Sequence, residues 1–201
     1  MNENTPTIYT ERLVLRKFTQ DDTEALFELL SDEEVNQFLP WFPLKDMGEA
    51  EQFLKTNYLR YYELDSAYRY AVCLKEDNQV IGYVCISSTP SFDLGYGLKK
   101  AFWHKGIAVE AASAVVKRTR AAGVPYITAT HDVHNPWSGK VMKKLGLTYR
   151  YSYQEQWMPK DIAVTFRMYQ VNFNGNDARV YGKYWDEAEV RFVEENLPND
   201  C

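Results

Sequence analysis

The chain has few cysteines and no apolar run long enough for a membrane. Its three cysteines are Cys73, Cys85 and Cys201, and no pair has the spacing of a metal site. We therefore expect reduced, buried thiols in a cytoplasmic protein. The most apolar stretches, such as 80–86, are far shorter than the roughly 20 residues that span a bilayer. The polar first residues lack the basic start and apolar middle of a signal peptide.

An excess of positive charge is also lacking. Lys and Arg total 23 against 28 Asp and Glu, which gives a formal net charge of −5. Because a nucleic-acid partner calls for a basic surface, this balance argues against one. Aromatic side chains are abundant, with 15 Tyr, 10 Phe and 5 Trp. At 45% hydrophobic and 25% charged residues, the composition excludes a disordered chain and predicts a folded domain with a sizeable core.

The spacing of apolar residues predicts a mixed fold. Strands are expected near 13–18 and over 70–74, 80–87, 92–98, 126–130, 149–157 and 162–171. Helices are expected over 19–30, 47–64, 107–122, 135–145 and 185–196. Gly123 and Gly146 follow two of these helices at positions that favour a left-handed cap. The predicted class is α+β, with a mostly antiparallel central sheet of about seven strands flanked by helices.

A candidate anion site lies where the strand that ends at Leu98 meets the helix that begins at Ile107. Amides at a helix N-terminus have no partners within the helix, and the helix dipole adds positive charge, so a phosphate suits this place. Gly106 lets the backbone approach a ligand, and Ala108 keeps the next turn open. Three lysines add positive potential: Lys99, Lys100 and Lys105. Alone, such a glycine can also simply ease a turn, and no Walker or dinucleotide pattern is present.

A second segment, 133–147, again places a strand end next to a capped helix, with Asn135 at the cap. Together the two segments resemble motifs A and B of the GNAT acetyltransferase superfamily. Gly106 and Ala108 match the small positions of the family's Gln/Arg-x-x-Gly-x-Gly/Ala loop. The second motif, Asn-x-x-Ser-x-x-x-x-x-Lys-x-Gly-Phe, is matched by Asn135, Ser138, Lys144 and Gly146, with Leu147 in place of Phe.

The opening residues 10–16 and the pair Glu110-Ala111 look like the branch that contains the ribosomal-protein-alanine N-acetyltransferases. The resemblance covers about residues 8–172, which we expect to form the acetyltransferase domain, with its sheet splayed in the middle. A C-terminal extension with a short helix is expected over 173–201. Two positions depart from the pattern. Trp103 replaces the Gln/Arg of the loop, and Met142 replaces a Tyr that protonates the departing thiolate in many relatives.

The resemblance implies that acetyl-CoA is the co-substrate, bound between the strands that end at Leu98 and Val133. Loop amides would hold its pyrophosphate, and the Leu98 backbone would pair with the pantetheine arm and polarise the thioester carbonyl. Asn135 and Ser138 would bond the arm from the other side. The implied set is Leu98, Trp103, His104, Lys105, Gly106, Ile107, Ala108, Asn135 and Ser138. The three histidines lack metal-ligand spacing, so we expect no metal.

The resemblance also implies that a primary amine attacks the acetyl carbon directly in a ternary complex, which requires the loss of a proton. Asp93, on the strand that leads to the thioester, and His134, beside Asn135, are candidate bases. Each has a plainer interpretation, as a solvated charge or as a turn hydrogen bond. Ser138 completes the catalytic candidates. The acceptor stays open among a protein N-terminus, a polyamine, an amino acid and an amine antibiotic.

Two other functions remain open at this point. Because Met142 cannot donate a proton, the chain could be a CoA-binding module without acetyltransferase activity. It could also be an unrelated nucleotide-binding domain. The segment after Asn172 is too apolar for a free tail, so we expect it to dock on its own domain or on a partner subunit, and a homodimer stays open. The apolar residues concerned are Tyr181, Tyr184, Trp185, Val190, Phe192 and Val193.

Overall fold

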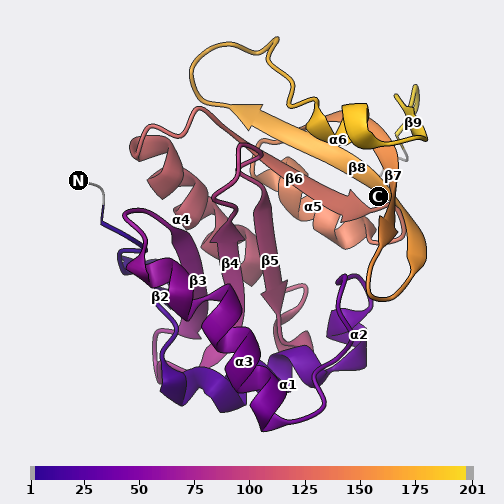
Figure 1. The fold of residues 1–201 in the computed structure, drawn as a ribbon. Coiled ribbons are helices and arrows are strands. Elements are labelled where there is room, and N and C mark those ends of the chain that lie inside the picture. Colours follow the sequence, from indigo (N-terminus) through magenta and orange to yellow (C-terminus); the bar gives the residue numbers. More distant parts are fainter. Residues whose placement is uncertain (1–2, 198–201) are drawn as a thin grey trace.

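The computed structural model describes residues 3–197, whose strands form two antiparallel sheets that meet edge to edge (Figure 1). The first sheet has the order β1-β2-β3-β4-β5, and the second has the order β6-β8-β7-β9. The two sheets touch through one parallel bridge, between Asp93 and Thr128. This arrangement confirms the predicted mixed α+β fold with a mostly antiparallel, splayed sheet.

The bounds of most elements agree with the sequence prediction. The strands are β1 (Ile8–Tyr9), β2 (Leu13–Arg16), β3 (Tyr68–Leu74), β4 (Val80–Ile86), β5 (Leu94–Leu98), β6 (Tyr126–Asp132), β7 (Thr148–Trp157), β8 (Ile162–Asn172) and β9 (Arg191–Phe192). The α-helices are α1 (Thr23–Ser31), α2 (Glu33–Asn36), α3 (Met47–Asn57), α4 (Ile107–Ala121), α5 (Pro136–Lys144) and α6 (Lys183–Glu187). The short 3-10 turns are η1 (Gln20–Asp22), η2 (Leu59–Glu63) and η3 (Lys100–Phe102). The two strands beyond the predicted seven, β1 and β9, are two residues long.

Helices cover both faces of the first sheet, with α1 and α3 on one side and α4 on the other (Figure 1). As a result, β3 and β4 are buried at nearly every position and do not alternate between apolar and polar residues. In β3, Val72 belongs to the core beneath α4, whereas Cys73 packs with α1 and α3. Gly123 and Gly146 each have a φ of +85°, which confirms the two predicted left-handed caps.

Two predicted helices have different bounds in the structure. The helix expected from residue 19 begins with the turn η1, and α1 follows from Thr23. The helix expected over 47–64 ends at Asn57, and the chain continues as η2. The Tyr62 hydroxyl accounts for this change, because it donates to the Arg69 carbonyl and accepts from the Phe18 amide, and these bonds pull the segment onto the strands.

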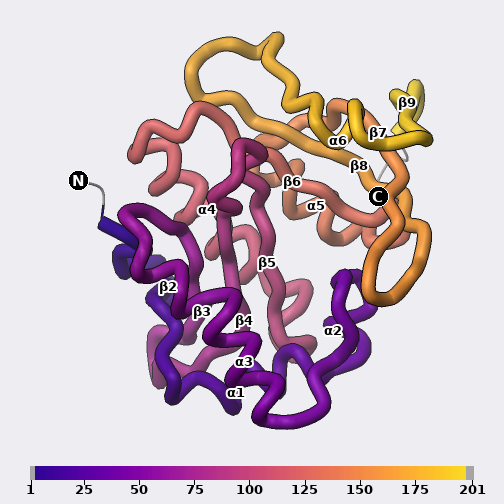
Figure 2. The backbone as a smooth tube through the Cα atoms, in the orientation of Figure 1, coloured from indigo at the N-terminus to yellow at the C-terminus, as the bar shows by residue number. Residues whose placement is uncertain are grey.

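The predicted terminal helix over 185–196 is wrong. The segment after β8 folds back across the second sheet (Figure 2), forms the short helix α6, and then pairs with β7 as β9. The reason lies in Arg191, whose Nη1 donates to the carbonyls of Trp185 (2.7 Å) and Ala188 (3.1 Å). These bonds satisfy carbonyls at the end of α6, so the helix stops there.

Of the two cysteines among the described residues, one has the predicted buried thiol and the other does not. Cys73 is a buried free thiol, as predicted, whereas Cys85 is a free thiol that stays partly exposed. Cys201 lies outside the described residues. Between residues 3 and 197, no helix has the length and apolar character needed to cross a bilayer.

Candidate active site

Beyond the bridge at Asp93 the backbones of β5 and β6 diverge (Figure 1), and we call the region between the two diverging backbones the gap. The Ser87 amide donates to the Asp93 carbonyl, and the Lys99 amide donates to the Ile81 carbonyl, each at 2.8 Å. The backbone groups of Asp93 and Lys99 therefore point toward β4. Since backbone direction alternates along a strand, the backbone groups of the residues at 94, 96 and 98 point away from β4, toward the gap. The gap consequently has an edge that can pair with an extended ligand.

The loop before α4 presents unpaired amides at the far end of this edge. Gly106 has a φ of +74°, and its carbonyl accepts the first helical bond, from the Glu110 amide at 3.0 Å. The amides of Ile107 and Ala108 therefore have no carbonyl partner within the helix. Residues 104–106 are exposed to solvent. The predicted phosphate site thus has the required backbone geometry, on a loop that a ligand can reach.

Trp103 holds the end of β5 in place. Its indole Nε1 donates to the Leu98 carbonyl at 2.8 Å. The Leu98 carbonyl therefore already accepts one hydrogen bond within the protein, while the Leu98 amide points toward the gap. His104 has a left-handed φ of +59°, and its ring packs edge-on against Trp137 at 4.4 Å.

Asn135 and Ser138 meet at the start of α5, as the second motif predicts. Asn135 caps the helix, and its side-chain oxygen accepts from the Ser138 amide at 3.3 Å. The Ser138 hydroxyl lies 2.8 Å from the hydroxyl of Tyr96, which also donates to the Ser138 carbonyl at 2.9 Å. Tyr96 belongs to β5, so this pair connects the two sides of the gap. Met142 is 1% exposed and packs in the core.

The sequence of residues 12–148 matches the model of the acetyltransferase (GNAT) domain. The chain belongs to the GNAT acetyltransferase family. It is 30% identical to the uncharacterised N-acetyltransferase p20 of Bacillus licheniformis, over 55% of this chain and 64% of that protein. It is 26% identical to the uncharacterised N-acetyltransferase YnaD of Bacillus subtilis, over 94% and 97% of the two chains.

A solved structure has the same fold as this GNAT chain. It is the RimL ribosomal L7/L12 α-N-protein acetyltransferase in complex with coenzyme A, with a TM-score of 0.74. The two chains are 19% identical, and the match covers 85% of this chain and 100% of that one. At this identity the likeness establishes the fold alone. Family membership makes the chain an enzyme of the N-acetyltransferase class.

The structure separates the two candidate bases of this GNAT domain. His134 follows β6, its ring contacts the Asp132 carboxylate at 2.9 Å, and its side chain is 82% exposed. Asp93 lies beside Thr128, which precedes His134 by six residues. Its Oδ1 accepts a hydrogen bond from the Thr128 hydroxyl at 3.0 Å. The strand carries Asp132 four residues, about 13 Å, beyond Thr128, and His134 follows in the turn after it, so the two candidate bases lie at different places along β6.

Asp93 has the environment of a proton acceptor. Burial chiefly raises the pKa of its carboxyl group, the Thr128 hydroxyl lowers it and the nearby Glu155 carboxylate raises it, and the net pKa is about 7. The side chain nevertheless keeps partial contact with solvent. Gly95 and Gly97 follow at alternate positions of β5 and share its face. No β5 side chain follows Asp93 on this face, where Cys85 packs against Gly95 and the Tyr83 ring packs against Gly97.

The lysines near the loop have other partners than expected. Lys99 forms an ion pair with Glu28 at 2.6 Å, and Lys100 forms one with Glu34. Lys105 is exposed, and its carbonyl accepts from Arg12. The expected positive potential at the loop therefore depends on Lys105 and on the backbone amides.

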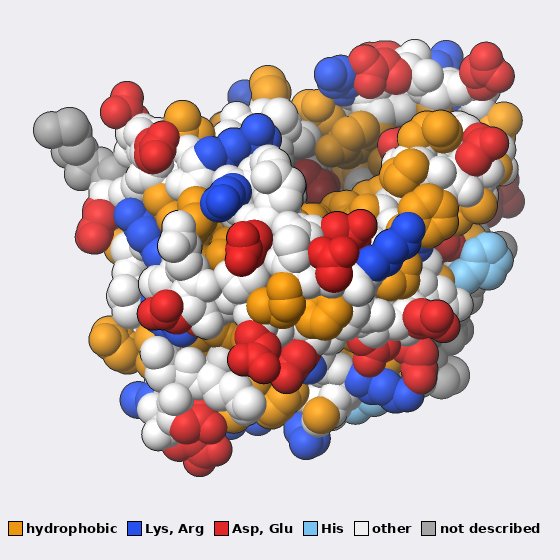
Figure 3. Space-filling view, turned by 60° about the horizontal axis from the view of Figure 1, so that its bottom comes forward, with side chains coloured by type: hydrophobic (Ala, Val, Ile, Leu, Met, Phe, Trp, Pro, Cys, Tyr) orange, Lys and Arg blue, Asp and Glu red, His pale blue; other side chains and the backbone are white. Residues whose placement is uncertain are grey.

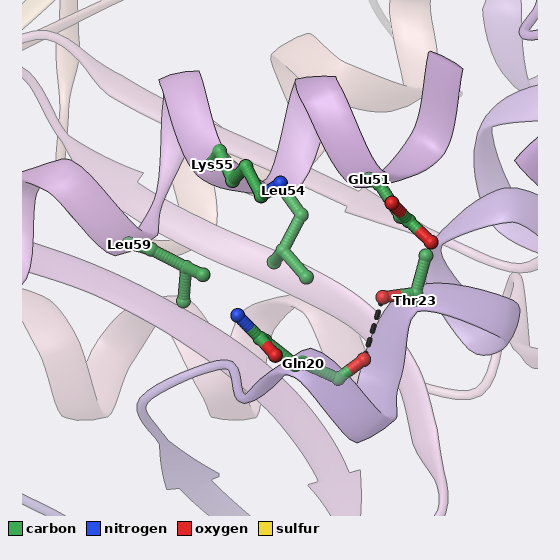
Figure 4. Close-up of a pocket in the computed structure, with 6 residues that line it drawn as sticks. All are labelled: Gln20, Thr23, Glu51, Leu54, Lys55 and Leu59. Atoms are coloured by element: carbon green, nitrogen blue, oxygen red, sulfur yellow. Dashed lines mark hydrogen bonds between the residues drawn. The ribbon is translucent and has the colours of Figure 1, made fainter. Parts of the chain in front are cut away.

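A separate hollow of about 230 Å³ lies between η1, α1 and α3 (Figure 4). Its lining residues are Gln20, Thr23, Glu51, Leu54, Lys55 and Leu59. None of them belongs to the gap or to the loop before α4, so this hollow is not part of the candidate site. Within residues 3–197, no three His, Cys, Asp or Glu side chains gather as a metal cluster would require.

Sequence reasoning missed several residues that surround the gap. Tyr96 could have been found, because it alternates with Leu94 and Leu98 in a strand already placed next to the ligand. Thr128 and Glu155 gave no such signal. Their relation to Asp93 depends on how the two sheets meet.

Proposed function

We propose that the protein transfers an acetyl group from acetyl-CoA to a primary amine by direct attack in a ternary complex. The main support for this proposal is one observation. The free edge of β5 leads directly to a loop with unpaired amides at the N-terminus of α4. An extended arm that ends in a diphosphate fits this arrangement, since strand edges pair with extended backbones or amides and helix N-termini bind phosphates. The RimL structure, which contains coenzyme A, supports it.

Several residues would hold acetyl-CoA. The amides from His104 to Ala108 would bind its pyrophosphate, and the backbone groups of β5 that face the gap would pair with the pantetheine arm. Ser138 would contact the arm from α5, while Asn135 keeps the start of that helix in place. Trp103 acts indirectly, since it fixes the Leu98 carbonyl at the junction of strand and loop.

The chemistry requires one base and one acid. Asp93 accepts a proton from the incoming ammonium, and the free amine attacks the acetyl carbon. The new C–N bond forms as the C–S bond breaks, and the thiolate leaves. The second proton that the attacking nitrogen loses passes through the Ser138–Tyr96 hydroxyl pair to the thiolate, because Met142 cannot donate one, and Asp93 releases the first proton to solvent. His134 takes no part in this scheme, since it lies at the other end of β6.

A thiol-release assay over a panel of amines and N-terminal peptides tests the proposal. Thiol release from acetyl-CoA that depends on an added amine, together with mass-spectrometric detection of the acetylated amine, is the expected result. A protein that binds CoA by calorimetry but releases no thiol with any acceptor would instead be a CoA-binding module. The burial of Met142 is the observation that favours this second function.

A further inference from the structure

Side-chain hydrogen bonds connect the segment after β8 to the second sheet at both of its ends. At its start, the buried Gln170 side chain donates to the Arg179 carbonyl at 2.9 Å and accepts from the Tyr181 amide at 2.8 Å. At its end, the Glu194 carboxylate accepts two bonds from Arg167, each at 2.8 Å. These contacts hold the intervening residues, α6 included, in one position. The segment is therefore a fixed part of the molecule.

This fixed segment places tyrosine rings beside Asp93. Tyr184 of α6 stacks on Tyr153 of β7, with centroids 5.3 Å apart and planes 11° apart. Tyr181 meets the Tyr184 ring edge-on at 5.1 Å. The Tyr184 hydroxyl interacts with the side chains of Ser91 and Thr128, and Thr128 also bonds to Asp93. We call Tyr153, Tyr181 and Tyr184 the aromatic wall; Tyr153 is buried behind Tyr184, and the half-buried Tyr181 and Tyr184 supply its surface.

The surroundings of the aromatic wall carry negative charge from Asp93, Glu155 and Glu187, of which Glu187 forms an exposed ion pair with Lys183 at 3.7 Å. Glu155 raises the pKa of Asp93, and Glu187 raises that of Glu155, in each case after burial as the larger cause. Asp93 in turn raises the pKa of Tyr153 and Tyr184. Among the described residues, the main charged influences on Asp93 and Glu155 include no Lys, Arg or His. A cation from outside would relieve this accumulated charge.

The hairpin of β7 and β8 is held at its tip. Lys160 at the tip donates to the Asn36 carbonyl of α2 at 2.7 Å, and Figure 1 shows the hairpin reaching α2. Figure 3 shows a depression in the surface with hydrophobic side chains around it and an acidic side chain at depth. A site limited by this hairpin and by the C-terminal segment suits a compact ligand better than an extended peptide.

We propose that the C-terminal segment forms one side of the acceptor site, where the aromatic wall and Asp93 receive a primary ammonium attached to a compact apolar body. The proposal rests on the proposed function and adds the class of acceptor. Aromatic faces attract cations, and a carboxylate at the end of such a wall directs the ammonium toward itself. The same carboxylate then takes the proton whose loss starts the reaction.

Steady-state transfer to 2-phenylethylamine, at saturating acetyl-CoA, tests the proposal with the full chain. Tyr184→Leu keeps apolar volume but removes the ring, and we expect it to raise the KM for the amine about tenfold. The affinity for acetyl-CoA should not change, because the wall lies apart from the loop before α4. Trp185→Leu is the matched control on the same helix, since Trp185 packs on Tyr151 and Arg191.

A binding measurement separates this proposal from the proposed function. The unreactive cation N,N,N-trimethyl-2-phenylethylammonium should bind to the wild-type chain in calorimetry, and Tyr184→Leu should weaken that binding about tenfold. If no amine supports thiol release but the cation still binds in this way, the proposed function fails and the cation site stands. Equal binding by the wild type and Tyr184→Leu would overturn the proposal. So would a higher kcat/KM for alanyl or seryl peptides than for the arylalkylamine.

Discussion

Arg12 and Glu110 lie 98 residues apart in sequence, yet Arg12 Nε donates to Glu110 Oε2 at 2.7 Å. The other carboxylate oxygen, Glu110 Oε1, accepts hydrogen bonds from the Arg12 amide at 2.9 Å and from the Thr10 hydroxyl at 2.6 Å. Arg12 Nη1 also donates to the Lys105 carbonyl at 3.0 Å. The turn before β2 therefore holds both the loop and the first turn of α4 in the geometry that exposes the loop amides.

We expect Arg12→Gln to raise the KM for acetyl-CoA severalfold and to change kcat less, because the loop loses the donor to Lys105 while the reacting groups stay in place. Steady-state kinetics with varied acetyl-CoA measures the effect. Lys183→Gln is the control, since Lys183 forms an exposed ion pair within α6. An unchanged KM in Arg12→Gln would show that the loop keeps its shape without this anchor.

Gly106→Val should weaken CoA binding by at least about tenfold and leave the fold intact. A left-handed residue with a branched side chain costs about 1–2 kcal/mol, and the chain can avoid this cost by turning the loop amides away. Calorimetry with CoA and far-ultraviolet circular dichroism measure the two effects. Gly123→Val, at the other end of α4, carries a similar backbone cost at φ +85° but should bind CoA normally.

The pH dependence should report the carboxyl group of Asp93. Since its pKa lies at about 7, the carboxylate that accepts the proton is lost below that pH, so kcat/KM for the amine should rise with pH and level off above about 7. In Asp93→Asn, we expect a low kcat/KM that keeps rising toward the pKa of the amine itself. The titratable groups that interact electrostatically with Asp93 are Glu155, Tyr153, Tyr184, Tyr181, Tyr96 and Cys85.

The control for this profile is His134→Gln. Because His134 is exposed and lies at the other end of β6, the variant should keep the wild-type profile. Loss of the limb near pH 7 in His134→Gln, with its retention in Asp93→Asn, would reverse the assignment of the base.

Gly139→Ala should destabilise the protein, because a Cβ atom at this position would lie 2.7 Å from His131 Nε2. His131 is 4% exposed and packs against Tyr169, so it has little room to move. Such overpacking costs about 1–3 kcal/mol, or several degrees in the thermal midpoint. In Gly182→Ala, the new methyl would lie 3.5 Å from Asp186 Oδ2, an ordinary contact, so thermal unfolding should change little. Equal midpoints for the two variants would contradict this prediction.

Much of the fold and the loop site follows from local signals in the sequence. Caps such as Gly123 and Asn135 act on the backbone within a few residues, so the ends of α4 and the start of α5 can be predicted without knowledge of the rest of the chain. The predicted phosphate site at Gly106 likewise depends on residues that are close together in the sequence. The terminal helix was predicted wrongly because Arg191, which satisfies the last carbonyls of α6, acts through a folded turn that periodicity does not reveal.

The sequence by itself determined that this chain folds as a mixed sheet with a glycine turn before α4, since caps and alternation are set by neighbouring residues. Only the tertiary structure showed that Asp93 and His134 lie apart and in different surroundings, because their separation depends on where β5 meets β6. It also brought Tyr184 to Asp93. That contact requires the C-terminal segment to pack on β7 and β8, a long-range arrangement driven by the burial of aromatic surface.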